Sequence, residues 1–121
     1  MKHLVIACCS NVITGALTDA LKPKYIVHTC KSSDELTVLL DTYHPCVLII
    51  SLFLHGSDGI AALNSCKYKP SIVLALTYVI SQSIMNDARN AGIQELILLP
   101  CTIKHILNRL DILIHRINPT D

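Results

Sequence analysis

Hydroxyl and thiol side chains follow the apolar stretches of this chain, at positions where a catalytic or binding residue would be sought. Ser51 ends the most hydrophobic stretch, residues 46–50, while Cys8 and Cys9 follow the first apolar stretch and Thr77 ends the fourth. A hydroxyl becomes a nucleophile when a base lies beside it, and a metal ion needs several ligands around it. The sequence shows neither arrangement near Ser51, so these residues point away from catalysis.

Five extended apolar stretches alternate with five stretches of helical periodicity. We expect strands at residues 3–7, 25–29, 46–50, 72–77 and 93–99. We expect helices over about 12–21, 33–43, 81–91 and 103–114, and another that begins near residue 58. The expected N-caps are Ser10 or Asn11, Ser32 or Ser33, Asp58 and Thr102, with Gly92 as a C-cap. The spacing places Val12, Ala20 and Ala61 on the inward faces of their helices.

This alternation predicts the fold class. Strand–helix units with short connections require right-handed crossovers and a parallel sheet covered on both faces. We therefore expect an α/β, flavodoxin-like (βα)5 three-layer sandwich whose five-stranded parallel sheet has the order 2-1-3-4-5. Its switch point lies between strands one and three, next to the loops that carry Cys8, Cys9 and Ser51. Residues 1–117 are predicted to form this domain, and 118–121 the start of a linker to a possible C-terminal output domain.

Composition excludes several classes of protein. Hydrophobic residues make up 51% and charged residues 16% of the chain, which excludes a disordered protein. The net charge of +1 comes from scattered residues and gives no footprint for nucleic acid. No apolar run is long enough to span a membrane and no export signal is present, so we expect a cytoplasmic domain whose six cysteines stay reduced.

Four segments carry a family resemblance that covers almost the whole chain. Residues 45–59 resemble the third strand of a response-regulator receiver domain (CheY-like) and its L-x-L-x-G-x-D-G loop. Residues 75–77, 90–93 and 99–101 are similar to the ends of the fourth strand, the fourth helix and the fifth strand in that family. The resemblance implies a role in two-component signal transduction and phosphorelay.

The departures from this family bear on function. A receiver ordinarily has an acidic pair, an aspartate that accepts phosphate and a lysine; these positions match Cys8 and Cys9, Ser51, and Leu99. Thr77 keeps the family's hydroxyl, whereas Leu96 replaces an aromatic residue. An acyl phosphate requires a carboxylate nucleophile, Mg²⁺ prefers carboxylate oxygens, and leucine supplies no charge. We therefore predict a degenerate phosphorylation pocket with no metal, no cofactor and no phosphotransfer.

Two residues could replace the missing acceptor. Asp58 is the nearest acid, but its position before Gly59 favours a helix cap. Ser51 is expected to be a buried, hydrogen-bonded replacement for the acid.

The resemblance implies a pseudo-receiver that is not an enzyme and that acts by protein contacts. It would belong to a bacterial transcription regulator, for example of the sporulation-regulator type, and contact DNA only through an output domain beyond Asp121. Receivers commonly pair through their fourth helix, fifth strand and fifth helix, which makes Lys104, Arg109 and Asp111 candidates for a dimer face. The expected partners are a second copy or a regulatory protein, and no membrane.

Two alternatives remain open. One is a sensor for a metal, an oxidant or a small ligand. Its residues would be Cys8, Cys9 and Cys101, which follow strands one and five, with His55 nearby. We expect these two strands to flank the end of strand three. Apolar filling of the pocket by these thiols is the simpler interpretation. A flavodoxin-like enzyme is disfavoured because residues 9–15 lack a phosphate-binding motif. The histidines show no mutual spacing and are expected at surface or edge positions.

Overall fold

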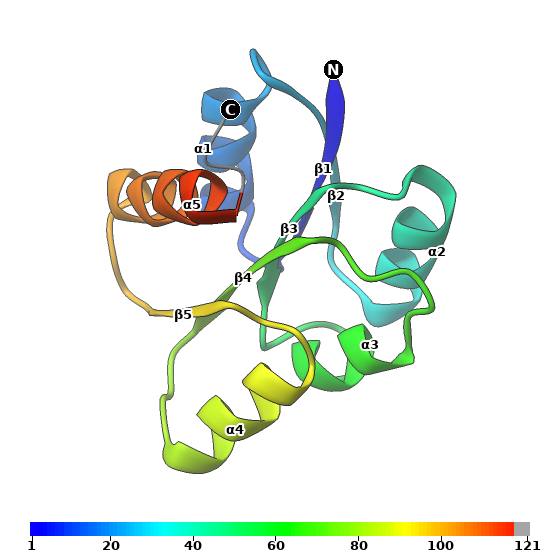
Figure 1. Cartoon of the computed structure of the whole chain (residues 1–121), viewed down its shortest axis with the longest axis vertical. Coiled ribbons are helices and arrows are strands. Elements are labelled where there is room, and N and C mark those ends of the chain that lie inside the picture. Colours follow the sequence, from blue (N-terminus) through cyan, green and yellow to red (C-terminus); the bar gives the residue numbers. More distant parts are fainter. Residues whose placement is uncertain (118–121) are drawn as a thin grey trace.

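Five parallel strands form one sheet in the order β2-β1-β3-β4-β5, which confirms the predicted order (Figure 1). The structure is a computed structural model that describes residues 1–117, so the expected linker at 118–121 lies outside the described residues. The strands are β1 (Lys2–Ala7), β2 (Tyr25–Cys30), β3 (Val47–Ser51), β4 (Ile72–Thr77) and β5 (Glu95–Leu98). β3 and β4 lie in the middle and are buried along their whole length.

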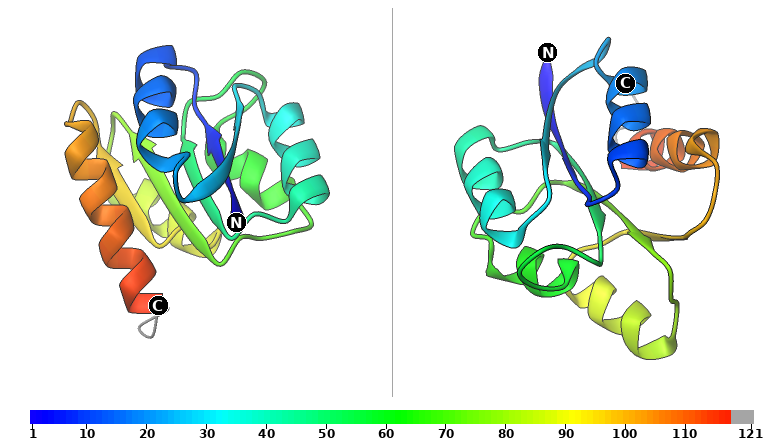
Figure 2. Two further views of the ribbon diagram at one scale, coloured as in Figure 1. Left: turned by 90° about the horizontal axis from the view of Figure 1, so that it is seen from above. Right: turned by 180° about the vertical axis from the view of Figure 1, so that it is seen from behind.

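Helices cover both faces of the sheet (Figure 2). α1 (Asn11–Leu21) and α5 (Ile103–Ile117) lie on one face, and α2 (Ser33–Tyr43), α3 (Gly59–Ser65) and α4 (Gln82–Asn90) lie on the other. Three layers result, as expected for the flavodoxin-like class.

Polar caps fix where the helices begin. Ser10 caps α1 and Ser32 caps α2, each accepting a hydrogen bond from the backbone N–H three residues further on. Asp58 caps α3 in the same way, and the Thr102 hydroxyl accepts from the N–H of His105 at 3.0 Å. Of the alternatives left open by the sequence, the caps are therefore Ser10 and not Asn11, and Ser32 and not Ser33.

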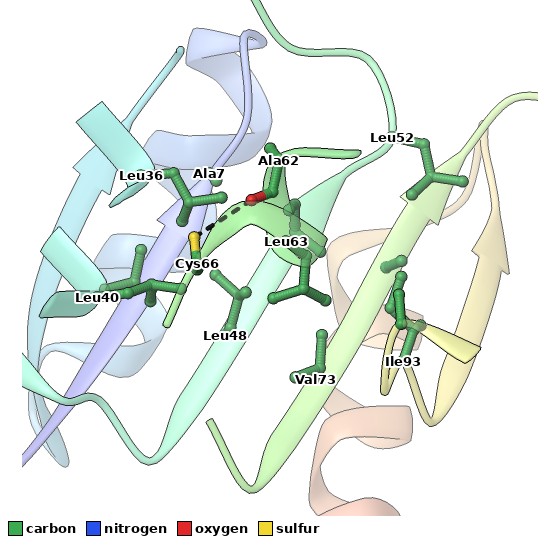
Figure 3. Packing of buried hydrophobic residues seen from close by; sticks show 14 of the residues in the cluster. Ala7, Leu36, Leu40, Leu48, Leu52, Ala62, Leu63, Cys66, Val73 and Ile93 are labelled. Atoms are coloured by element: carbon green, nitrogen blue, oxygen red, sulfur yellow. Dashed lines mark hydrogen bonds between the residues drawn. The ribbon is translucent and has the colours of Figure 1, made fainter. Parts of the chain in front are cut away.

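Two apolar layers hold the sheet to its helices. On the face of α2, α3 and α4, Leu36, Leu48 and Leu63 are fully buried, and the Cys66 thiol donates to the carbonyl of Ala62 at 3.2 Å (Figure 3). On the other face, Leu17 of α1 and Ile106 and Leu110 of α5 pack against the sheet. The central strands are therefore held from both sides.

Some predicted helix faces are wrong. Val12 is 81% exposed and Ala20 is also exposed, because α1 buries Leu17 and Leu21 along a narrower stripe than the sequence pattern indicated. In α3, Ala62 is buried and Ala61 is exposed. The helix begins at Gly59, and this start sets which side faces the sheet.

Candidate functional site

Ser51 ends β3 with its hydroxyl bonded to its own loop. Its side chain donates to the carbonyl of Phe53 at 3.3 Å and accepts from the Phe53 N–H at 3.2 Å, and the residue is 6% exposed. The hydrogen bonding expected of Ser51 is therefore present. A hydroxyl held in this way has its hydrogen committed to a backbone carbonyl, and none of the described side chains acts on it as a base through a hydrogen bond.

Thr77 repeats this arrangement at the end of the neighbouring strand β4. Its hydroxyl donates to the carbonyl of Val79 at 2.9 Å and accepts from the Val79 N–H at 3.2 Å, with the residue 0% exposed. Each hydroxyl thus turns the chain over two residues as it leaves the sheet. At the ends of both strands, the hydroxyl oxygen forms hydrogen bonds with the backbone of its own loop.

Gly59 fixes the loop that follows Ser51. A Cβ atom at this position would lie 2.3 Å from the carbonyl oxygen of Ser51, so no larger residue fits without movement of the backbone. The Gly59 N–H donates to the carbonyl of Leu52 at 2.9 Å, which folds the loop back on the strand. Asp58 is then placed as the cap of α3, with its carboxylate accepting from the N–H of Ala61 at 2.7 Å. The predicted capping role of Asp58 is confirmed.

The neighbouring thiols Cys8 and Cys9 have different surroundings after β1. Cys8 is buried in the apolar layer beneath α1 and α5. Cys9 is partly exposed, and its thiol lies 3.3 Å from the carbonyl of Lys31 and 3.6 Å from that of Phe53. Cys9 therefore joins the loops after β2 and β3, while Cys8 fills the core.

The expectation that strands one and five flank strand three is wrong, because β4 lies between β3 and β5. Leu99 is buried in the layer beneath α1 and α5, and its N–H donates to the carbonyl of Thr77 at 2.7 Å. Cys101 packs against the same layer, and burial raises the pKa of its thiol. It follows the outermost strand and does not lie beside Ser51 in the sheet.

His55 holds its loop through the backbone. Its N–H donates to the carbonyl of Lys31 at 2.9 Å, and its carbonyl accepts from the N–H of Ser33 at 3.0 Å. Within residues 1–117, no three His, Cys, Asp or Glu side chains come close enough together to hold a metal ion. The grouping of Cys8, Cys9, Cys101 and His55 expected for a metal sensor is not formed in the described chain.

We use the name rim pocket for Cys8, Cys9, Ser51, Thr77 and Leu99, although Thr77 lines one hollow of the surface and Cys8 another. They belong to the carboxyl ends of β1, β3 and β4 and to the turn after β5, so they lie along one edge of the sheet. The set contains two thiols, two hydroxyls and one aliphatic side chain. It supplies neither a carboxylate nor a permanent positive charge.

The candidate dimer residues on α5 face different neighbours. Arg109 forms a two-pronged ion pair with Glu95 of β5, with one of its two bonds at 2.8 Å, and this pairing raises the pKa of the guanidinium. Asp111 lies 3.5 Å from His115 on α5 itself, and Lys104 is exposed. Arg109 therefore already ties α5 to β5 within one chain.

One histidine pair was not foreseen from the sequence. His3 Nδ1 and His28 Nε2 lie 2.9 Å apart on β1 and β2, and the ring of Tyr43 stacks on His28 with its centroid at 3.9 Å. Burial, together with the neighbouring His3, lowers the pKa of His28. His28 lies on the edge strand β2, as expected, whereas His3 lies on β1 between β2 and β3. Their contact depends on the pairing of β1 with β2, which spacing along the chain does not reveal.

Comparisons with known proteins identify the fold. No family model matches the sequence, and no curated protein is similar to it in sequence. A receiver domain protein (CheY-like) from Methanospirillum hungatei has a similar structure, with a TM-score of 0.87 and 16% identity over 100% of this chain and 99% of that one. The architecture of this chain is thus that of response-regulator receiver domains.

Two further structures are similar at comparable identity. A response regulator from Burkholderia pseudomallei, which has a phosphorylated aspartic acid, a calcium ion and citrate, gives a TM-score of 0.78 and 22% identity over 91% of this chain and 66% of that one. A DNA-binding response regulator of the LuxR family from Staphylococcus aureus gives a TM-score of 0.75 and 17% identity, over 92% of this chain and 99% of that one. Such identities establish the fold alone.

The rim pocket does not fit the divalent cation that a phosphorylated receiver uses. Mg²⁺ prefers an octahedron of hard oxygen ligands that includes carboxylates. The rim side chains offer sulfur, hydroxyl and hydrocarbon, and the nearby carboxylate of Asp58 accepts a backbone hydrogen bond as a helix cap.

Proposed function

We propose that this chain is an atypical receiver domain, a pseudo-receiver, which regulates a partner by protein–protein contacts without aspartyl phosphorylation and without enzymatic activity. The observation that carries the proposal is the neutral rim pocket within a receiver fold. Ser51 stands at the end of β3, where a carboxylate would be needed to form an acyl phosphate, and its hydroxyl is bonded to Phe53.

The rest of the pocket supports the same conclusion. A phosphoryl group carries negative charge that must be neutralised by a metal ion or a cationic side chain. Leu99, buried in the core, cannot provide that charge, and Cys8 and Cys9 replace the acids that would hold a metal. Three separate changes thus remove the nucleophile, the metal ligands and the cation.

We place the domain in the cytoplasm, within a bacterial transcription regulator that contacts DNA through a separate output domain. The receiver-fold architecture shared with a DNA-binding response regulator from Staphylococcus aureus supports this assignment. None of the helices in the described residues combines the length and apolar character needed to cross a bilayer. The scattered charges of the domain give it no surface of its own for DNA.

Phosphorylation tests the central part of the proposal. The protein is incubated with acetyl phosphate and Mg²⁺ and its intact mass is measured before and after hydroxylamine treatment, beside a receiver that keeps its aspartate. We expect no added phosphoryl mass on this chain. An adduct on Ser51 or Asp58 would overturn the proposal.

The partner is proposed to be a second copy or a regulatory protein that meets the α4–β5–α5 surface. Leu98 of β5 is exposed there, with Lys104 exposed at the start of α5. Sedimentation velocity of Lys104→Glu and Leu98→Glu against the wild type measures self-association, and we expect both changes to weaken it. Asp34→Lys on α2 serves as a control, since it changes charge away from this face. If wild type and variants sediment identically as monomers, the homodimer is rejected and the regulatory partner remains.

A second candidate function is an oxidant sensor at the rim. The partly exposed thiol of Cys9, which joins two loops, is the observation in its favour. Burial raises the pKa of the Cys30 thiol to about 12, so this sulfur is a poor nucleophile near neutral pH. Peroxide treatment followed by alkylation and peptide mass mapping tests the candidate. Selective oxidation of Cys9 with a change in association would favour it, and uniform resistance would remove it.

A further inference from the structure

A groove of about 580 Å³ runs between α3 and α4, next to the rim pocket. α4 buries only Ala88 of its nine residues, so much of the surface that it turns toward α3 stays open. The groove is lined by Leu52, Phe53, Asp58, Ile60, Ala61, Asn64, Thr77, Ile84, Asp87 and Asn90. A hollow of this volume is within the range of pockets that bind small molecules.

Apolar and aromatic groups form part of the groove. Ile60 and Ile84 are half-buried, and each packs against the core from its own helix. Phe53 is 52% exposed and Tyr78 58% exposed, with their rings inclined at 47° and their centroids 6.1 Å apart. Phe53 lines the groove and Tyr78 packs against Phe53, so two exposed aromatic rings and the apolar half of the lining suit a ligand with a hydrocarbon body.

The charged side chains that line the groove are both negative. Asp58 and Asp87 are exposed, and within residues 1–117 neither forms a salt bridge. No lysine or arginine of the described chain lines the hollow, and Asn64 and Asn90 are neutral. A positively charged group of a ligand would be attracted to these carboxylates by its charge. It would also be attracted to the neighbouring aromatic rings by cation–π interaction.

A metal ion fits this groove poorly. Within the part of the chain that the structure describes, no third His, Cys, Asp or Glu joins Asp58 and Asp87 to complete a metal site, and Asp58 already accepts the Ala61 N–H. Asn64, Thr77 and Asn90 also offer oxygen atoms, but the apolar half of the lining would give a hydrated ion no ligand on that side. An organic cation, whose hydrocarbon part can pack against the apolar residues, therefore fits the groove better than a metal ion.

We propose that the groove between α3 and α4 binds a small organic cation, an ammonium or guanidinium group on an aryl or alkyl body. The body packs against Ile60, Ile84 and Phe53, and the cationic head lies between Asp58 and Asp87. This inference does not depend on the rim pocket being inactive. It assigns a ligand class to a surface that shares only Thr77 with the rim pocket.

The test is a titration of the ¹⁵N-labelled protein with phenethylammonium, 4-phenylbutylammonium and benzamidinium, followed by amide chemical shifts. Phenylacetate serves as the matched anion and benzyl alcohol as the matched neutral compound. We expect saturable shifts at Ala61, Asn64 and Asp87 with the cations, and weaker or no binding of the other two compounds. Equal binding of cation and anion, or no saturable shift with any cation at millimolar concentration, would overturn the proposal.

Charge-removing variants complete the test. Asp87→Asn removes one carboxylate from an exposed helix position, and Asp58→Asn keeps a side chain that can cap α3. We expect each to weaken cation binding about five- to tenfold, the effect of losing one charge-assisted hydrogen bond. Asp34→Asn on α2 is the matched control and should leave binding unchanged. Unchanged binding in both groove variants would contradict the proposed head-group position.

Discussion

The rim pocket and the groove between α3 and α4 adjoin, and Thr77 belongs to both, yet they use their polar atoms in opposite ways. In the rim pocket, Ser51 and Thr77 each turn their hydroxyl back onto the chain two residues further on. In the groove, Asp58 and Asp87 keep their carboxylates in solvent without a cationic partner in the described chain. The rim hydroxyls bond only to the backbone, whereas the groove keeps negative charge that no cation of the described chain neutralises, even though Asp58 also caps α3.

Under the proposed function, this edge of the sheet keeps the geometry of a receiver without its phosphorylation chemistry. The strand order and the backbone match a receiver architecture closely enough for a TM-score of 0.87. The side chains that would handle a phosphoryl group are neutral or buried. Fold comparison therefore identifies the scaffold, and the function has to be argued from the side chains.

Gly59 links the two regions, and its replacement has the largest predicted effect. A Cβ at this position meets the Ser51 carbonyl at 2.3 Å, so Gly59→Ala should push α3 away from β3. We expect a loss of about 1–3 kcal/mol in the free energy of unfolding, the usual cost of overpacking. Urea denaturation followed by circular dichroism measures it.

Gly15 provides the control for that experiment. It lies in α1, and beyond its own helix backbone no atom would come within 4 Å of an added Cβ, so an alanine side chain meets open space. Gly15→Ala should therefore stabilise the protein by about 0.5–1 kcal/mol, since alanine favours a helix interior over glycine. If both alanine variants change the free energy of unfolding equally, the close approach of Gly59 to Ser51 does not determine how α3 packs against β3.

Removing a rim hydroxyl should have a smaller effect. Ser51→Ala and Thr77→Val each leave a backbone N–H, that of Phe53 or Val79, without its hydrogen-bond acceptor. We expect a loss of about 1 kcal/mol for each, measured by the same urea denaturation. Cation binding in the groove should persist in Ser51→Ala. Loss of binding there would show that the two regions act as one site.

The smallest effect concerns pH and a group outside both regions. Burial, and then the neighbouring His3, lowers the pKa of His28 in the folded protein. Below the ordinary histidine pKa of about 6.5 the unfolded chain therefore binds more protons, and stability should fall as pH drops from there toward the folded value. Thermal unfolding of wild type and His28→Gln between these limits measures the difference. An identical pH dependence in both would show that His28 does not cause the response.

Much of this structure follows from the sequence. The continuous apolar runs predicted β3 and β4. Aspartate and threonine before helical stretches predicted the caps at Asp58 and Thr102, and the cap of α2 was narrowed to Ser32 or Ser33. These features depend on neighbours within a few residues, and local physics decides them.

Features that depend on contact between distant segments were missed. The separation of Cys101 from Ser51 follows from β4 lying between their strands, and the groove depends on how far α4 stands from α3. Nothing in the sequence singled out Asp87 as a groove residue. The pairing of Arg109 with Glu95 likewise joins a helix to a strand that precedes it by several residues. Spacing along the chain carries no information on such pairs until the packing is known.

Binding of Mg²⁺ tests the central claim most directly, because it asks whether the rim pocket holds the ion that phosphorylation needs. The ¹⁵N-labelled protein is titrated with MgCl₂ while the amide signals of Cys8, Ser51 and Thr77 are followed. We predict no saturable shift at these three positions. Saturable binding that moves Cys8 and Ser51 together, and that Ser51→Ala abolishes, would contradict the account.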